Sequence, residues 1–583
     1  MNKEWSLKEL YSGVTDEKFK KDMTKLDELI VEGNKLADNL NDCNKETLAK
    51  YIKYSEEISS LFDKLFTYLG LRQSANTSDN EAIGLLGKIS QKVSEVTQAD
   101  TKFTEYLANY PELEKTVNED EYLSEYAFHF FNRKKAMEHT LLPATEEAIS
   151  LYKISGSSAW SDLQGYLTST VPVEYEGKTT TLSDIRNKAY DKDAKVRKSA
   201  YEAELQAYDR IKDAIAYAVN SIKLEVINGC KLRNYESPLA ENLEGNHMKR
   251  ETLDALMVAL KESLPKFWDY MRAKAGLLGY EGGLKWYDLF APLEGNTKKF
   301  TTEEARDYLV ELFSGFDKEE ADMIATAFDD SWIDFFPRDG KVGGAFCSDC
   351  HSLKQSRILT NFDGTLGDVV TLAHELGHGF HNYCMRDNSI LNLDISMPVA
   401  ETASTFNEVV CMNAAISRET DSVAKRALIE SQLMDAAQII CDIYSRYLFE
   451  TAVFEKREDN FLFADELCNI MTEAQKKAYG TGLDENCMHP YMWACKSHYY
   501  STYSFYNYPY AFGGLFARGL YAKYLKEGKD FVPLYKKLLK ATGSRSVEDA
   551  ALIAGIDLTD VNFWRESLKI LTDEIDEFIE LCK

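Results

Sequence analysis

The chain has 583 residues, of which 44% are hydrophobic and 28% are charged, and its formal net charge is −27. This length allows one large buried core or several domains. So negative a surface repels nucleic acid and anionic lipid, and we expect neither as a partner. The start carries no signal-peptide pattern, and no window approaches about 20 apolar residues. We therefore expect a soluble, cytoplasmic protein without a membrane segment.

The eleven cysteines are scattered, and only Cys347 and Cys350 form a C-x-x-C pair. A structural zinc ribbon would need a second such pair, and a redox motif would need a βαβ context. Since neither is present, we predict reduced thiols, as is usual in a cytosol.

Helical periodicity dominates from the start of the chain. Residues 16–40 place Phe19, Met23 and Leu26 at steps of three and four, with charges between them. The same pattern recurs in residues 45–71, 197–227, 425–456 and 560–582.

Strand signals are few. Residues 168–184 predict a hairpin that turns at Glu176-Gly177, and residues 340–349 and 356–362 predict two short strands. We therefore predict a mainly α fold with a small β-sheet near residue 370, and a rough boundary between residues 182 and 200.

Residues 371–384 read TLAHELGHGFHNYC and predict a helix capped by Thr365 with Asp368 in its first turn. On a helix, His374 and His378 differ by about 40° of rotation and about 6 Å of rise, so both rings can face one ion. Glu375 projects beside that ion. This is the H-E-x-x-H pattern, in which the histidines hold zinc and the glutamate is the general base.

The third ligand must come from elsewhere. His381 lies about 10 Å along the axis from His374, so we predict a residue of the site wall and not a ligand. Residues 396–416 predict a neighbouring helix that carries Glu401 and Glu408 on one face. One of these could bind zinc while the other orients a histidine ring, and spacing alone does not choose between them.

At this point the chain resembles a known family. LAHELGHGFH (372–381) and AETASTFNE (400–408) resemble the M3 family of zinc metallopeptidases, and within it the oligoendopeptidase F branch. Further segments are similar to that branch: residues 4–11, 156–186, 343–347, 358–378 and 498–514.

The resemblance implies one zinc ion per chain, held by His374, His378 and Glu401, with Glu375 as the catalytic glutamate and Glu408 supporting the ligands. It also implies a two-lobed helical body with a deep cleft that admits only short peptides. By the same comparison we divide the chain into an N-terminal helical region (1–109), a lobe segment with the hairpin (110–190) and a catalytic zinc peptidase region (191–583).

Residues 498–514 are rich in tyrosine. Most of these rings are expected to pack in the interior. Family members place a histidine and tyrosines from this segment over the reacting carbonyl, and we match these to His498 and Tyr508 as catalytic residues. Tyr503 and Tyr510 are matched as substrate-binding residues.

Two further hypotheses concern the peptide backbone. We expect a substrate to pair antiparallel with residues 356–362 as an edge strand, and Gly343 and Gly344 to form part of the same wall.

The sequence thus predicts a zinc endopeptidase that hydrolyses internal bonds of short peptides. A dipeptidyl carboxypeptidase or carboxypeptidase on the same zinc site is the first alternative. A non-catalytic zinc-containing peptide-binding protein is the second. The sequence does not determine oligomeric state or substrate preference.

Overall fold

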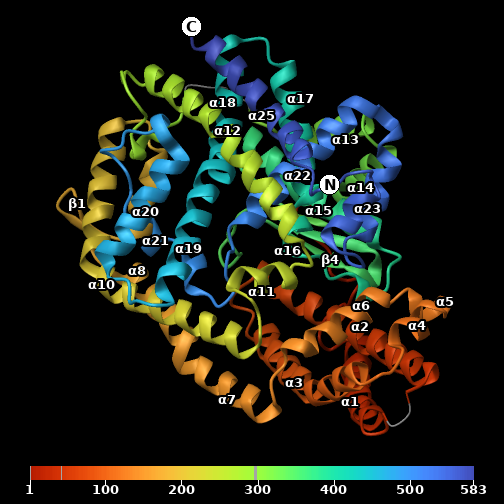
Figure 1. The fold of residues 1–583 in the computed structure, drawn as a ribbon. Coiled ribbons are helices and arrows are strands. Elements are labelled where there is room, and N and C mark those ends of the chain that lie inside the picture. The colour runs from red at the N-terminus through yellow and green to blue at the C-terminus, as the bar shows by residue number, and fades with distance from the viewer. Residues whose placement is uncertain (1, 41–42, 294–298) are drawn as a thin grey trace.

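The computed structural model describes residues 2–40, 43–293 and 299–583 (Figure 1). The chain is mainly helical, as predicted, and the described residues form one two-stranded and one three-stranded sheet. None of the helices described is long and apolar enough to cross a bilayer.

The N-terminal helices, red and orange in Figure 1, form a group of their own. Asp16, Asn44 and Asp79 each accept a hydrogen bond from a first-turn N–H and so begin the three long helices. The group consists of α1 (Glu17–Ala37), α2 (Lys45–Ala75), α3 (Asn80–Ala108), α4 (Leu113–Asn118), α5 (Glu121–Ser124), α6 (Ala127–Ala136) and η1 (Met137–His139).

A second group joins two segments that are far apart in the sequence. Residues 171–222 and 449–500 share one hydrophobic cluster, which includes Tyr208 and Trp493. Residues 143–232, which contain the first segment, form α7 (Pro143–Lys153), η2 (Ile154–Ser158), α8 (Ala159–Thr170), β1 (Val173–Tyr175), β2 (Lys178–Thr180), α9 (Leu182–Asn187), η3 (Lys188–Tyr190) and α10 (Ala194–Leu232). Its second segment holds α19 (Ile443–Arg457), α20 (Ala464–Tyr479), η8 (Gly480–Gly482), α21 (Met492–Cys495) and η9 (Ser497–Tyr500).

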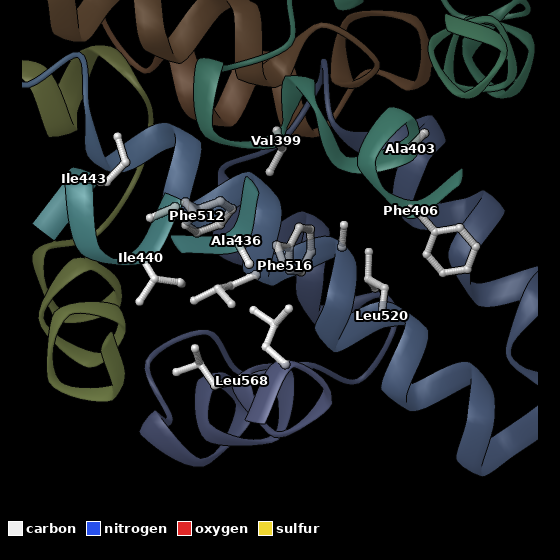
Figure 2. Packing of buried hydrophobic residues seen from close by; sticks show 14 of the residues in the cluster. Val399, Ala403, Phe406, Ala436, Ile440, Ile443, Phe512, Phe516, Leu520 and Leu568 are labelled. Carbon is white, nitrogen blue, oxygen red and sulfur yellow. The ribbon is translucent and has the colours of Figure 1, made fainter. Parts of the chain in front are cut away.

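The largest cluster lies in the third group. Figure 2 shows Phe512, Phe516 and Leu520 of α22 between the helices that carry Val399 and Phe406 and those that carry Ile440 and Leu568. The group contains α11 (Pro238–Gly245), α12 (Arg250–Leu277), η4 (Trp286–Asp288), α13 (Thr302–Ser314), α14 (Lys318–Asp329), η5 (His351–Leu353), α15 (Leu366–Met385), η6 (Ile390–Asn392), α16 (Met397–Ala400), α17 (Thr402–Arg418), α18 (Ser422–Ala437), η7 (Gln438–Asp442), α22 (Tyr508–Glu527), η10 (Gly528–Asp530), α23 (Val532–Ala541), α24 (Val547–Leu552) and α25 (Val561–Leu581).

The hydrophobic clusters do not follow the predicted divisions 1–109, 110–190 and 191–583. One cluster packs residues 48–52 with residues 103–130, so it spans the predicted boundary at 109. The second group pairs residues on both sides of the boundary at 190 with residues beyond 448. Long-range packing, which a local sequence pattern does not report, sets these units.

The hairpin forms as predicted. Val173 pairs with Thr180 and Tyr175 with Lys178, and Glu176 and Gly177 both have positive φ, 50° and 74°. Two central residues with positive φ are typical of the tight turns that match strand twist.

The three-stranded sheet has the order β3-β5-β4, with β3 at Ile333–Asp334, β4 at Phe346–Cys350 and β5 at Gln355–Leu359. The prediction that residues 356–362 form an edge strand is therefore wrong. β5 lies in the centre because β3 pairs with it in parallel and β4 pairs with it antiparallel. The edge strand that leads toward the candidate site is β4.

Candidate active site

The backbones of helices α15 and α17 approach each other very closely where the two helices cross. A Cβ at Gly377 would lie 2.5 Å from the carbonyl oxygen of Ala403 and 2.6 Å from Cα of Ser404. Only glycine allows the two backbones to approach this closely. The close crossing brings the histidine face of α15 against the start of α17.

Helix α15 begins where its sequence predicts, and the second helix does not run unbroken. Thr365 and Asp368 form a reciprocal capping box at the start of α15. The predicted second helix is broken, because Glu401 has φ −91° and ψ 12° and joins α16 to α17. The break turns the side chain of Glu401 toward α15, while Glu408 lies two turns further along.

Three side-chain donors converge at this crossing. Glu401 Oε2 lies 3.3 Å from His374 Nε2 and 3.1 Å from His378 Nε2. The ligand atoms of the three residues all lie within 4.8 Å of one another. His374 Nδ1 donates to Glu408 Oε1 at 2.7 Å, so Nε2 is the nitrogen that faces Glu401. The structure thus places Glu401 at the Nε2 atoms of both histidines and Glu408 at Nδ1 of His374, a distinction that spacing had left open.

The charge at this crossing suits a cation. Burial lowers the pKa of His374, but hydrogen bonds to Glu401 and Glu408 outweigh burial and raise it to about 10. Burial acts against the charge of Glu401, yet both histidines hold its pKa well below its usual range. Carboxylates that stabilise a positive charge on the neighbouring imidazole also favour a divalent ion, and two imidazoles with one carboxylate form a donor set typical of catalytic zinc. The residues present therefore fit the implied metal.

Ser404 is a supporting residue that sequence reasoning missed. Its hydroxyl donates to Glu401 Oε2 at 2.8 Å and fixes the carboxylate against α17. The serine three residues after a candidate ligand was a possible signal, since that spacing places it on the same face.

His381 lies outside the donor group, as predicted. It is 1% exposed, and its Nε2 hydrogen-bonds Oγ1 of Thr542 at 2.8 Å, where α15 packs on α23.

Glu375 lies beside the donors and is 5% exposed. Burial raises its pKa, the two histidines lower it, and Glu401 and Glu408 raise it again, with a net upward shift. Its charge also raises the pKa of the Cys347 thiol on β4, after burial. The edge strand therefore runs beside the candidate base.

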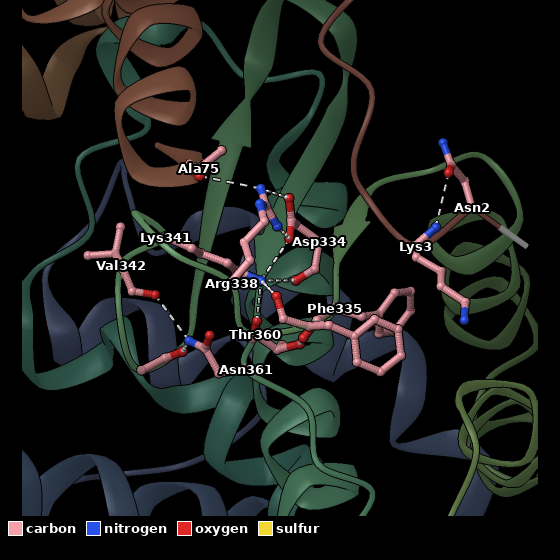
Figure 3. A network of polar contacts seen from close by, with 12 residues as sticks. Asn2, Lys3, Ala75, Asp334, Phe335, Arg338, Lys341, Val342, Thr360 and Asn361 are labelled. Carbon is pink, nitrogen blue, oxygen red and sulfur yellow. Dashed lines mark hydrogen bonds and ion pairs between the residues drawn. The ribbon is translucent and has the colours of Figure 1, made fainter. Parts of the chain in front are cut away.

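Gly343 and Gly344 lie in the loop that enters β4. Figure 3 shows how the neighbouring side chains hold this loop. Asn361 Nδ2 donates to the carbonyl oxygens of Val342 and Gly344, at 3.1 and 2.8 Å. The Lys341 ammonium, fully buried, donates to Asp334 Oδ1 at 2.7 Å and to the Thr360 carbonyl oxygen at 2.6 Å. The predicted glycine wall is thus a fixed loop next to an edge strand.

The rings of residues 498–510 form a cluster. His498 stacks on Tyr506 with centroids 5.0 Å apart, and its Nε2 lies 3.4 Å from the hydroxyl of Tyr510. The ring centroids of Tyr503 and Tyr506 are 5.4 Å apart, and Tyr506 is the central ring of the cluster. Tyr506 was not among the residues that the sequence analysis matched to the site.

The cluster lies against the donor helices. The Tyr506 hydroxyl is 3.8 Å from Met397 Sδ on α16. One turn beyond Tyr510, a Cβ at Gly513 would lie 3.4 Å from Cβ of Glu401. Burial lowers the pKa of His498, and the charges of Arg446 and Lys496 lower it further, so its ring is neutral near pH 7.

Tyr508 does not belong to this cluster. It is fully buried, and its hydroxyl donates to Asn242 Oδ1 at 2.7 Å and accepts from Asn246 Nδ2 at 3.0 Å. The Tyr508 hydroxyl is thus bonded to two buried amides and not directed at the cluster, and its catalytic role stays a prediction. Tyr503 also donates to Asn246, at 3.0 Å, so its hydroxyl points to the same amide.

One buried carboxylate anchors the segment. Glu450 on α19 is 2% exposed and accepts from Lys223 Nζ at 2.7 Å, from the backbone N–H of Phe505 at 3.1 Å and from Asn507 Nδ2 at 2.8 Å. Phe505 has φ 55°, and Asn507 caps α22. Glu450 lies 55 and 57 residues from its loop partners Phe505 and Asn507, so no local sequence pattern pointed to it.

The model of peptidase family M3 matches residues 188–570, well over half of the chain. The chain belongs to peptidase family M3. This is a family of metallopeptidases, and the matched range contains every donor at the α15–α17 crossing. The resemblance seen in the sequence is thereby confirmed.

Relatives of this M3 peptidase match along nearly the whole chain. Oligopeptidase PepF of Bacillus subtilis is 25% identical over 588 residues, covering 99% of this chain and 87% of the relative. Group B oligopeptidase PepB of Streptococcus agalactiae is 24% identical over 599 residues, covering 99% and 97%.

Solved structures share the fold. A putative peptidase from Chlamydophila abortus superimposes with a TM-score of 0.85 at 20% identity, covering 99% of this chain and 98% of that one. Oligoendopeptidase-F from Enterococcus faecium gives a TM-score of 0.71 at 20% identity, covering 97% and 98%.

Proposed function

We propose that this M3 peptidase is a zinc-dependent endopeptidase that hydrolyses internal bonds of short peptides. The observation that carries the proposal is the convergence of His374, His378 and Glu401 with Glu375 beside them. The similarity to relatives named oligopeptidase and oligoendopeptidase supports the substrate class.

His374, His378 and Glu401 would hold the ion. When bound, zinc supplies a Lewis acid and a water of lowered pKa. Glu408 holds His374 with Nε2 toward the site, since its carboxylate accepts the Nδ1 proton.

Glu375 acts as the general base. Burial moves the pKa of Glu375 upward, toward neutral pH. This suits a group that takes a proton from water and then passes it to the departing amine. The Tyr510 hydroxyl and the neutral His498 ring are the donors that we assign to the oxyanion, in place of Tyr508.

The peptide backbone has a matching partner. Among the described strands β4 pairs with β5 alone, so its other edge offers free N–H and C=O groups beside Glu375. A peptide added there would form main-chain hydrogen bonds with little demand on sequence. Proline at residues 357–361 would break the central strand and would not test this pairing.

The test uses a short peptide blocked at both ends, with Glu375→Gln against the unsubstituted chain. We expect the unsubstituted chain to cut an internal bond and Glu375→Gln to keep its metal while turnover falls by more than about 100-fold. Glu473→Gln, at an exposed position on α20, is the matched control and should cut normally. Cleavage only of peptides with a free C-terminus would favour a carboxypeptidase. Full activity of Glu375→Gln would contradict the assignment of Glu375 as the general base.

A further inference from the structure

A cavity of about 480 Å³ lies outside the residues placed in the active site. This volume is within the range of about 300–1,000 Å³ that is usual for small-molecule sites. Aromatic side chains form one wall of it at η3, η4 and their neighbours, among them Tyr190, Trp286, Tyr287 and Phe290.

One part of the lining is charged. The cavity is lined there by Arg186, Glu204, Asp442, His489 and Lys496. Arg186 Nε lies 3.3 Å from Glu204 Oε1, and Lys496 Nζ lies 3.8 Å from Asp442 Oδ2.

Arg186 and Lys496 make only long contacts with the carboxylates of the cavity. Asp442 is already paired with Arg446 at 2.6 Å, which leaves Lys496 without a close anion. Within the part of the chain that the structure describes, the geometry gives neither the Arg186 guanidinium nor the Lys496 ammonium a hydrogen bond. Together with Arg446, three cations face two carboxylates, so one positive charge is uncompensated in a chain of net charge −27.

His489 adds a second, independent observation. It is 1% exposed and lines the cavity, yet neither ring nitrogen has a hydrogen-bond partner among the described residues. Glu204 lies 3.3 Å from Nε2 but in poor alignment. Buried ring nitrogens without partners are uncommon, and a ligand in the cavity would satisfy them.

The cavity adjoins the active site. Lys496 precedes His498 by two residues, and Gln438 and Asp442 belong to η7. On the other side of η7, Ile439 lies against Gly514 of α22, where a Cβ would be 2.4 Å from its Cδ1. The neighbouring Gly513 faces Glu401, so along this path the two helices η7 and α22 lie between the cavity and Glu401, while Lys496 and His498 link the two regions along the chain.

We infer that this cavity binds the C-terminal carboxylate of a peptide substrate, with its last side chain against the aromatic wall. The inference rests on the proposed peptidase function and extends it. A guanidinium and an ammonium provide the donors that a carboxylate accepts, and aromatic walls suit an apolar terminal residue. A cationic site at this position would favour peptides short enough to reach from the catalytic centre to the cavity.

The experiment compares one peptide ending in phenylalanine as the free acid and as the C-terminal amide. On the unsubstituted chain we expect the amide to have a KM about tenfold higher with kcat little changed, the loss expected for one charged hydrogen-bonding group. Equal KM values for acid and amide would overturn the inference.

Variants locate the effect. In Arg186→Gln/Lys496→Gln the acid and amide should have the same KM. Lys198→Gln, exposed on α10 at 58%, is the control and should keep the preference. A preference that survives in the double variant would place carboxylate binding elsewhere and overturn the assignment. If the double variant fails to fold, the comparison on the unsubstituted chain still decides.

Two arms separate the sources of the carboxylate. A peptide amide that ends in aspartate should keep the high KM, and a low KM would overturn the assignment to the chain terminus. N-acetyl-phenylalanine should compete at a lower concentration than its amide, and equal competition would count against the site.

Failure of the proposed peptidase function can be distinguished from failure of the cavity inference. If neither acid nor amide is cut, the peptidase proposal fails, and calorimetric binding of the two peptides then tests the cavity alone, with tighter binding of the acid expected.

Discussion

Two regions form the candidate active site, and their sequences predict the directions of their side chains to different degrees. One is the crossing of α15 and α17, and the other is the aromatic segment 498–510. At the crossing, His374, His378 and Glu408 stand on regular helices, where spacing fixes the direction of each side chain. In the aromatic segment, a short η9 turn, a left-handed Phe505 and the start of α22 follow within a few residues. Sequence spacing therefore predicts directions in the first region and not in the second.

Tyr508 and Tyr510 show the difference. In an extended loop, residues two apart point to the same side, so Tyr508 and Tyr510 would present their hydroxyls together. The segment instead begins α22 at Tyr508. On a helix, residues two apart differ by about 200°, so one hydroxyl turns to α11 and the other to His498.

The largest effect should come from the anchor of the aromatic segment. Glu450→Ala leaves the buried Lys223 ammonium without its carboxylate, and we expect the free energy of unfolding to fall by about 3–5 kcal/mol. Urea unfolding would measure this, and metal analysis of the folded fraction should show donors still occupied. Glu458→Ala removes an exposed pair between the end of α19 and Lys231 of α10 and should cost less than about 1 kcal/mol. Equal losses in the two variants would contradict the anchoring role.

The next effect tests the crossing itself. Gly377→Ala places a Cβ against the backbone of α17, so we expect about 1–3 kcal/mol of destabilisation and a lower metal content, because the helices must separate. Gly367→Ala on the same helix meets only Thr365 Oγ1, at 3.6 Å, and should keep both stability and metal. Thermal unfolding and metal analysis of the pair would show whether close approach positions the donors. Full metal content in Gly377→Ala would argue against it.

A smaller effect separates the two tyrosines. Tyr510→Phe should lower kcat by about tenfold or more and leave stability unchanged, since it removes a donor near His498. Tyr508→Phe should cost about 1 kcal/mol of stability and leave kcat nearly unchanged, since its hydroxyl bonds only to buried amides. Steady-state kinetics and unfolding of both variants provide the check. The reverse pattern would restore the sequence prediction.

The smallest effect concerns the glycine loop. Asn361→Ala removes two partly exposed hydrogen bonds to the carbonyl oxygens of Val342 and Gly344, so stability should fall by only about 0.5–1 kcal/mol. KM should rise several-fold if the loop helps to bind the peptide backbone. Asn486→Ala, in an exposed turn far along the chain, is the control. An unchanged KM in Asn361→Ala would exclude the loop from substrate binding.

The sequence by itself determined the donors on α15, the hairpin turn and the mainly helical class, because each depends on contacts within a few residues. It also narrowed the third ligand to two glutamates on one segment. Residue type and short-range spacing carry this information directly.

Only the tertiary structure decided which glutamate meets the histidine nitrogens, which strand lies at the sheet edge and which tyrosine faces His498. These outcomes depend on the break at Glu401, on the insertion of β5 between two strands and on the anchor at Glu450. Each is fixed by contacts between segments far apart in the chain, whose relative placement follows from packing of the whole core and not from any local pattern.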